Sequence, residues 1–238
     1  MALGDDSLKI GIIGAGNIGG ALTRRLSEMG HEIFVANSRG PETLTDLAAE
    51  TGATAVTVPE ATRGVDVVVI TIPQKNVRDL PKDLFADTPP NVVVVDTGNY
   101  YPRERDGRIE DIENGMTESR WVSKQIGRPV VKAFNTIYAN HIETRGKRTG
   151  EPGRIALPVA GDDPAAKALV IRLMDEIGFD GVDAGTLDES WRQQPGTPVY
   201  GTDLDAEGLR RALAQASPKR APQWSGTARS PGTFTAPA

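Results

Sequence analysis

The sequence predicts an α/β fold: a doubly wound, mostly parallel sheet followed by a C-terminal extension. Two observations lead to this prediction. Short apolar runs of strand length alternate with segments of helical spacing from Lys9 onward. Two of these runs, residues 65–71 and 91–96, are nearly continuous and rich in β-branched side chains. Such runs are typical of parallel strands that are buried on both faces.

Composition narrows the function classes. The 238 residues are 38% hydrophobic and 25% charged, which suits one large domain or one domain with an appendage. The net charge is −5 and no long basic run occurs, so nucleic acid is not expected as a partner. The absence of cysteine excludes disulfides, thiolate nucleophiles and cysteine-held metal clusters. Residues 1–7 form an acidic tail without an apolar signal core, and no apolar run is long enough to cross a membrane. A cytoplasmic protein is expected.

A glycine-rich turn follows the first predicted strand, residues 9–13, and opens the first helix. Gly14 permits the tight turn, Gly16 lets a pyrophosphate approach the backbone, and Gly19 lets the helix pack on the strand. This spacing predicts dinucleotide binding at the positive end of the helix. A tight strand-to-helix turn that uses glycines without a ligand is the alternative. The other residues of the predicted phosphate site are Ala15, Asn17 and Ile18.

The end of the second strand, residues 32–36, indicates which dinucleotide binds. A carboxylate at this point would hold the ribose 2′-hydroxyl of NAD. Here neutral Asn37 is followed by Ser38 and Arg39, which can donate hydrogen bonds to a 2′-phosphate. The turn therefore predicts NADP(H) rather than NAD, the alternative being a solvated turn. His31, beside the glycine that ends the first helix, is predicted to be a solvated turn residue.

Further along the chain, ligand contacts are expected at the carboxyl edge of the sheet. Pro73 ends the predicted fourth strand, residues 65–71, at this edge. The predicted sixth strand, residues 129–134, ends beside Asn135 and Thr136, which either contact the nicotinamide or the acceptor or only cap the strand. His141 beyond them is either a proton relay or a surface histidine. The expected contacts are Thr71, Ile72, Pro73, Asn135 and Thr136. The predicted helices are 42–51, 74–85 (partly broken), one from 117, 165–177 with Asp163 as its cap, and 205–216; the remaining strands are 53–57, 129–134 and 179–184.

Three motifs, residues 14–20, 37–39 and 131–136, together resemble the F420-dependent NADP oxidoreductase family. The resemblance implies a Rossmann NAD(P)-binding fold over residues 8–185, with cofactor contacts extended to Ala133 and Phe134. It also implies hydride transfer between NADP(H) and a deazaflavin coenzyme, F420, as co-substrate. Residues 186–238 are expected to be a helical extension and a tail rich in Pro, Ser, Thr and Gly, pinned across the chain's own domain or a partner subunit.

Hydride transfer between two heterocycles needs positioning and exclusion of water, so no catalytic side chain and no metal site are predicted. Two alternatives stay open. One is an NADPH-dependent reductase with another acceptor: a flavin, a quinone, a metal chelate or an imine. The other is a non-catalytic NADPH-binding regulator whose cleft is filled by residues 187–238. The expected partner is a small-molecule hydride acceptor, and a homodimer is left open.

Overall fold

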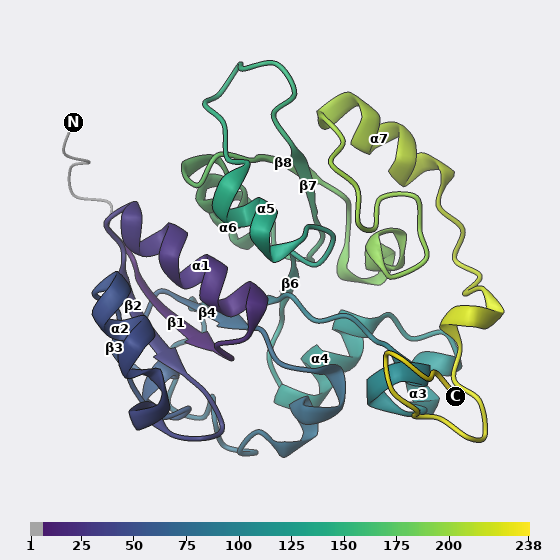
Figure 1. Cartoon of the computed structure of the whole chain (residues 1–238), viewed down its shortest axis with the longest axis horizontal. Coiled ribbons are helices and arrows are strands. Elements are labelled where there is room, and N and C mark those ends of the chain that lie inside the picture. Colours follow the sequence, from purple (N-terminus) through teal and green to yellow (C-terminus); the bar gives the residue numbers. More distant parts are fainter. Residues whose placement is uncertain (1–6) are drawn as a thin grey trace.

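A six-stranded parallel sheet forms the centre of the fold (Figure 1). The computed structural model describes residues 7–238, so all of the predicted N-terminal tail except Ser7 lies outside the described residues. The strand order β3-β2-β1-β4-β5-β6 is the doubly wound order of dinucleotide-binding folds, which confirms the predicted fold class. The strands are β1 (Lys9–Ile13), β2 (Glu32–Ala36), β3 (Thr54–Ala55), β4 (Val67–Ile70), β5 (Val93–Asp96), β6 (Val131–Lys132), β7 (Ala156–Val159) and β8 (Asp180–Asp183).

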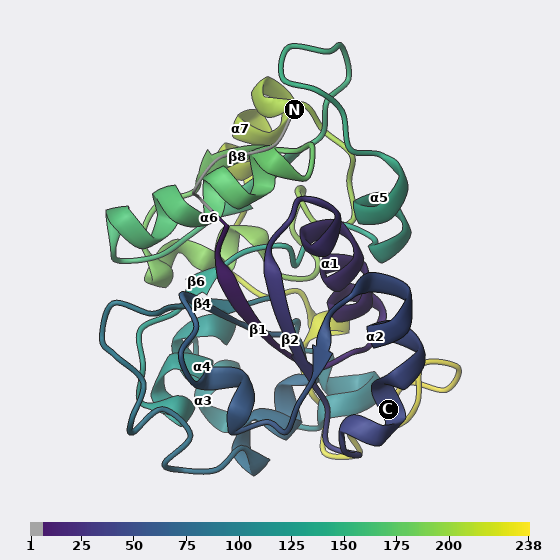
Figure 2. The same ribbon diagram turned by 90° about the vertical axis from the view of Figure 1, so that its left-hand side faces the viewer.

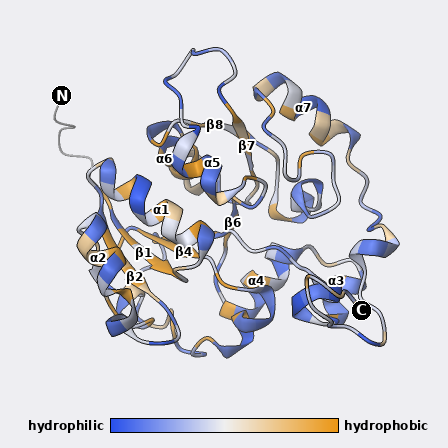
Figure 3. Ribbon diagram, viewed as in Figure 1, coloured by the Kyte–Doolittle hydropathy of each residue, from blue (hydrophilic) through white to orange (hydrophobic). Residues whose placement is uncertain are grey.

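The strand side chains pack on both faces of this sheet. In β4, Val67 and Val69 lie in the apolar core on one face, while Val68 and Ile70 lie in the core on the other. All four are at most 2% exposed. Neighbouring residues of a strand point to opposite faces, so a strand buried in this way needs an unbroken apolar run. Figure 3 shows β1, β2 and β4 as hydrophobic strands beneath helices with hydrophilic outer faces.

Helices cover the sheet on its two faces (Figures 1 and 2). α1 packs on α5 over one face, and α6 adds Leu173 and Met174 to the same core. On the other face α4 buries Trp121 and Val122. Within residues 7–238 no helix has the length and apolarity needed to cross a bilayer. The α-helices are α1 (Asn17–Glu28), α2 (Thr45–Thr51), α3 (Glu110–Glu113), α4 (Glu118–Ile126), α5 (Ala139–Thr144), α6 (Pro164–Glu176) and α7 (Ala206–Gln215).

β7 and β8 form a second, two-stranded parallel sheet. A backbone bridge between Lys132 of β6 and Ala160 joins it to the carboxyl side of the main sheet. α6 and α7 both pack on this small sheet. Asp163 and Asp205 cap the two helices with their side-chain oxygens, which confirms the predicted start of each.

Two predicted helices differ from the structure. Residues 74–85 form only a short 3-10 turn, Gln74–Asp79, followed by irregular chain. Pro81 accounts for the early end, because it has no N–H to donate and restricts the residue before it. The helix predicted over 42–51 begins with a separate 3-10 turn, Pro41–Leu44, before α2.

The prediction that His31 is a solvated turn residue was wrong. The side chain is buried, with the residue only 8% exposed. Its Nδ1 accepts a hydrogen bond from the N–H of Leu8, and its Nε2 lies 2.8 Å from Oε2 of Glu176. Because Nδ1 accepts, Nε2 carries the proton that bonds to the carboxylate. His31 therefore ties the end of α1 to α6.

The C-terminal segment, residues 217–238, lies across the chain's own fold beside α3 (Figure 1). The N–H of Gly226 donates to Oε1 of Glu113 in α3, at 2.7 Å. The carbonyl of Arg103 accepts from the N–H groups of Gly232 and Ala238, at 2.7 and 3.1 Å. The tail is thus fixed to α3 and to the π-helical turn Pro102–Asp106 that follows β5.

Candidate functional site

The three glycines of the first turn are required for different reasons. A Cβ on Gly14 would lie 2.3 Å from the carbonyl oxygen of Thr71, and Gly14 has a φ of +110°. A Cβ on Gly19 would lie 1.8 Å from the carbonyl oxygen of Gly14. The fold itself therefore demands these two glycines. A Cβ on Gly16, with ordinary φ and ψ of −76° and −160°, would meet no atom within 4 Å.

The N-terminus of α1 is open to solvent. Gly16 is the N-cap residue, so no side chain accepts a hydrogen bond from the first N–H groups of the helix. Gly16 and Asn17 are exposed, and the first turn carries no acidic side chain. Unpaired N–H groups and the positive helix end make a ready anion site. The open space at Gly16 fits the close approach of a phosphate group.

The turn after β2 presents a free cation. Oδ1 of Asn37 accepts from the N–H of Arg39 at 2.9 Å, which fixes the turn, and Ser38 and Arg39 are exposed. Within residues 7–238 the guanidinium of Arg39 makes no hydrogen bond or ion pair. The nearby guanidinium of Arg24 is bound to Glu50, at 2.7 Å, and is not free in this way. Arg39 is therefore the cation available to a 2′-phosphate.

A groove of about 740 Å³ runs over the N-terminal half of α1 and is called here the α1 groove. Its lining includes Arg24 and Arg39, the helix start at Gly16 and Asn17, and Tyr138 just before α5, together with the acidic residues Asp46, Glu50 and Glu143. A second hollow of about 270 Å³ adjoins it, because Asn17, Tyr138 and Ala139 line both. The two spaces therefore share a wall.

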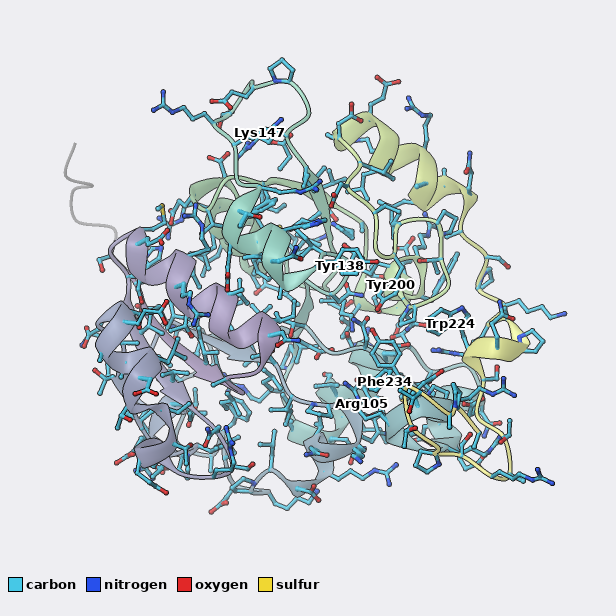
Figure 4. All side chains as sticks on the ribbon, in the orientation of Figure 1. Arg105, Tyr138, Lys147, Tyr200, Trp224 and Phe234 are labelled. Atoms are coloured by element: carbon cyan, nitrogen blue, oxygen red, sulfur yellow. The ribbon has the colours of Figure 1, made fainter. Side chains whose placement is uncertain are left out.

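The second space, called here the tyrosine hollow, has no charged residue in its lining. Its walls combine phenols, amides and apolar side chains. Figure 4 shows Tyr138 and Tyr200 in the region between α5 and the chain beyond α6. The lining residues are Asn17, Ile18, Thr97, Asn99, Tyr101, Phe134, Asn135, Thr136, Ile137, Tyr138, Ala139, Tyr200 and Gly201.

Two of the three phenols in the lining, those of Tyr101 and Tyr200, stay neutral. Burial, with a smaller contribution from neighbouring Tyr200, raises the pKa of Tyr101 well above that of a free phenol. Burial likewise raises the pKa of Tyr200. The two hydroxyls share a hydrogen bond. Neither phenol can act as an anionic base near neutral pH, which suits chemistry that depends on positioning.

Phe134 has a φ of +60°, although bulky side chains rarely adopt the left-handed region. Such a conformation costs roughly 1–3 kcal/mol and is commonly found at functional sites. It lies two residues after the end of β6 and, almost fully buried, in the lining of the hollow. The surrounding core holds it in place.

The amide of Asn135 is occupied by internal partners. Its Nδ2 donates to Oδ1 of Asn99 and to the carbonyl of Gln193, and its Oδ1 accepts from Nε2 of Gln193. The carbonyl of Asn135 accepts from Nδ2 of Asn99 at 2.9 Å. These bonds favour the alternative role for Asn135, which is to fix the strand end and the loop after β5. Thr136 lies in the lining with its carbonyl bound to the N–H of Gly201.

The remaining predicted residues lie outside both spaces. Thr71 and Ile72 pack beneath Gly14, and Pro73 precedes the following 3-10 turn. Ala133 is fully buried below the hollow. His141 bonds through Nδ1 to Asp203 at 2.9 Å and reaches the hollow only through its ring contact with Tyr138.

The sequence motifs gave no role to a lysine that is buried in β6. Lys132 is completely buried, and its Nζ donates to the carbonyl of Gly98. The ammonium lies 3.4 Å from Oδ2 of Asp96 and 4.0 Å from Oε2 of Glu118. Glu118 in turn accepts from the N–H of Tyr100, and Asp96 accepts from the N–H of Gly98. Through these bonds to Gly98 and Tyr100, the ammonium and the two carboxylates hold the loop that leads into Tyr101.

One signal for Lys132 was present in the sequence: a charged residue inside an otherwise apolar strand. Tyr101, Tyr138 and Tyr200 carried no such signal, since they belong to loops distant in sequence. Only the folded chain places their rings around one space.

Comparison with known proteins gives a family match and structural relatives. Residues 9–100 match the family described as NADP oxidoreductase, coenzyme F420-dependent. Protein SMa0349 of Sinorhizobium meliloti is 31% identical, with a TM-score of 0.69, over 83% of this chain and 95% of that one. A protein of Arthrobacter sp. FB24, named as a candidate F420-dependent NADP-reductase, is 22% identical with a TM-score of 0.61, over 76% of this chain and 86% of its own. That likeness concerns the fold.

A curated relative, YjhV of Escherichia coli (strain K12), is 48% identical over 64 residues. The matched segment is 27% of this chain and 47% of YjhV, so the chain spans about half the length of that curated relative.

Proposed function

We propose that this chain, which belongs to the family of coenzyme F420-dependent NADP oxidoreductases, transfers a hydride between NADP(H) and a deazaflavin of the F420 type. The observation that carries the proposal is that these two spaces adjoin. The α1 groove includes the free guanidinium of Arg39 and the open helix end at Gly16, and it shares Asn17, Tyr138 and Ala139 with the uncharged tyrosine hollow. A dinucleotide needs these parts together: a cation, an anion-binding turn and an uncharged pocket.

The residues of the chain would then have separate tasks. Arg39 and Ser38 would bind the 2′-phosphate, and the N–H groups at the start of α1 would bind the pyrophosphate. The hollow would receive the nicotinamide, with Phe134 and Ile18 in its lining. When bound, NADPH supplies the hydride, and the protein contributes orientation and exclusion of water.

The acceptor would enter at the tyrosine hollow. Flat conjugated rings are suited to aromatic walls, which favours a deazaflavin. Transfer between two carbon centres requires no acid or base from the protein, in agreement with the neutral phenols. The modest volume, about 270 Å³, supports a second candidate: reduction of a smaller neutral acceptor such as an imine or a quinone.

The test is to mix the protein with NADPH and oxidised deazaflavin under exclusion of oxygen. The visible absorbance of the deazaflavin is expected to bleach in step with NADPH oxidation. With NADPH deuterated at the transferred position, the label is expected on the acceptor ring. The Gly16→Val variant serves as the control that lacks the phosphate site. If NADPH binds and no bleaching occurs, deazaflavin is the wrong acceptor; if NADPH does not bind, the site itself is wrongly assigned.

A further inference from the structure

The wall of the tyrosine hollow is built from loops. Tyr101 lies in irregular chain after β5, where its N–H donates to Oδ2 of buried Asp106 at 2.7 Å. Tyr200 lies in a turn 99 positions later and is joined to Tyr101 by the bond between their hydroxyls. Loop side chains keep a fixed position only when other groups pack behind them. The groups behind these two rings therefore determine the shape of the hollow.

Two aromatic rings of the C-terminal segment, those of Trp224 and Phe234, contact the tyrosines. Figure 4 shows both rings in the same region as Tyr200. The ring of Trp224 lies 6.3 Å from that of Tyr101 and 6.1 Å from that of Tyr200, centre to centre. The ring of Phe234 meets Tyr101 edge-on at 5.6 Å. These are ordinary distances for aromatic contacts. Neither Trp224 nor Phe234 lines the hollow itself. Trp224 is half-buried, whereas Phe234 is 63% exposed, so the indole supplies the larger part of the support.

Buried contacts hold this segment against the wall. Nη2 of Arg220 donates at 2.9 Å to Oε1 of Glu118, a side chain with no exposed surface. The same guanidinium lies over the ring of Tyr100, 5.2 Å from its centre. At Gly196 a Cβ would lie 2.4 Å from Cδ1 of Trp224, so the indole fits against bare backbone. The segment is thereby tied to the charged group that fixes the loop before Tyr101.

We propose that Trp224 and Phe234 are positioning residues for the hydride acceptor: they hold Tyr101 and Tyr200 in place and so set the dimensions of the hollow. This inference rests on the proposed function, because it assigns acceptor binding to that space. The NADP(H) contacts at Gly16 and Arg39 lie in the α1 groove and do not involve the C-terminal segment. Loss of the two rings should therefore affect the acceptor and spare the cofactor.

The first test needs no acceptor. Amide hydrogen exchange in the full chain compares wild type with Trp224→Ala and Phe234→Ala. The N–H groups of Gly98, Tyr100 and Tyr101, all bonded to buried carboxylates, are expected to exchange at least about tenfold faster in the variants, while α1 is unchanged. Arg229→Ala is the control, since that exposed side chain makes no hydrogen bond, ion pair or ring contact within the described residues 7–238.

The second test is kinetic. For Trp224→Ala we expect KM for the deazaflavin to rise about tenfold, with kcat altered less than about twofold and the NADPH dissociation constant unchanged. Trp224→Phe should restore most of the loss. In a Tyr101→Ala background the same substitution should have little further effect, because the two residues act as one unit.

The outcomes separate the two proposals. Unchanged exchange at residues 98–101 in Trp224→Ala overturns the inference, whatever the activity. Faster exchange with an unchanged KM also overturns it, since the wall would then not matter to the acceptor. A wild-type chain that binds NADPH and reduces no deazaflavin refutes the proposed acceptor; the exchange result then decides the inference alone.

Discussion

Replacement of Gly16 by valine separates folding from cofactor binding. In the structure the new Cβ meets no protein atom, and φ and ψ suit any L-residue. Valine is a poorer N-cap than glycine, at a cost of about 1 kcal/mol. For a chain of this size that loss lowers Tm by roughly 2–4 °C. The fold should survive.

The effect on NADPH should be much larger. The valine side chain would occupy the space in front of the α1 N-terminus, where the pyrophosphate must lie to receive hydrogen bonds. Loss of two charge-assisted bonds, at about 1.5 kcal/mol each, amounts to about 3 kcal/mol. The dissociation constant should rise about a hundredfold.

Thermal melting and NADPH fluorescence titration measure the two quantities on the same sample. Gly19→Ala is the contrasting variant: its Cβ would lie 1.8 Å from the carbonyl oxygen of Gly14, so this smaller change should unfold the turn and lower Tm more than Gly16→Val does. NADPH affinity within twofold of wild type in Gly16→Val would refute the assignment of the phosphate to this turn.

Three further variants test the charged groups. Arg39→Ala should weaken NADPH binding roughly ten- to hundredfold, the value of a charge-assisted bond, and leave NADH titrations unchanged; equal losses for both cofactors would contradict the 2′-phosphate role. Lys132→Met leaves the buried carboxylate of Asp96 without its cation and leaves Glu118 with Arg220 alone, and urea unfolding should show a loss of about 3–5 kcal/mol. Arg120 lowers the pKa of Asp162 by donating to its carboxylate, so this stabilisation is present above pH of about 4 and is lost as pH falls through the lowered pKa. The difference in Tm between wild type and Arg120→Met should therefore be largest near neutral pH and should disappear in acid. A difference independent of pH would exclude this ion pair as its source.

Local patterns in the chain were sufficient for the sheet and for the phosphate turn. The unbroken run in β4 predicts burial on both faces, and the spacing of Gly14, Gly16 and Gly19 predicts a tight strand-to-helix turn. Both follow from backbone geometry over a few neighbouring residues, which the sequence displays directly. The exposed positions of Ser38 and Arg39 at the end of β2 follow from the same local reasoning.

Only the tertiary structure shows which residues surround the tyrosine hollow and which side chains become buried. The sequence predicts that His31 is a solvated turn residue, yet the side chain is buried against Glu176 of α6. Tyr101 and Tyr200 meet across 99 positions, and the tail completes their support with Trp224. No local period encodes such contacts, because they arise only when loops fixed at distant elements close on one another and exclude water. The sequence by itself determined the glycine turn that opens α1; packing decided the shape of the space beside it.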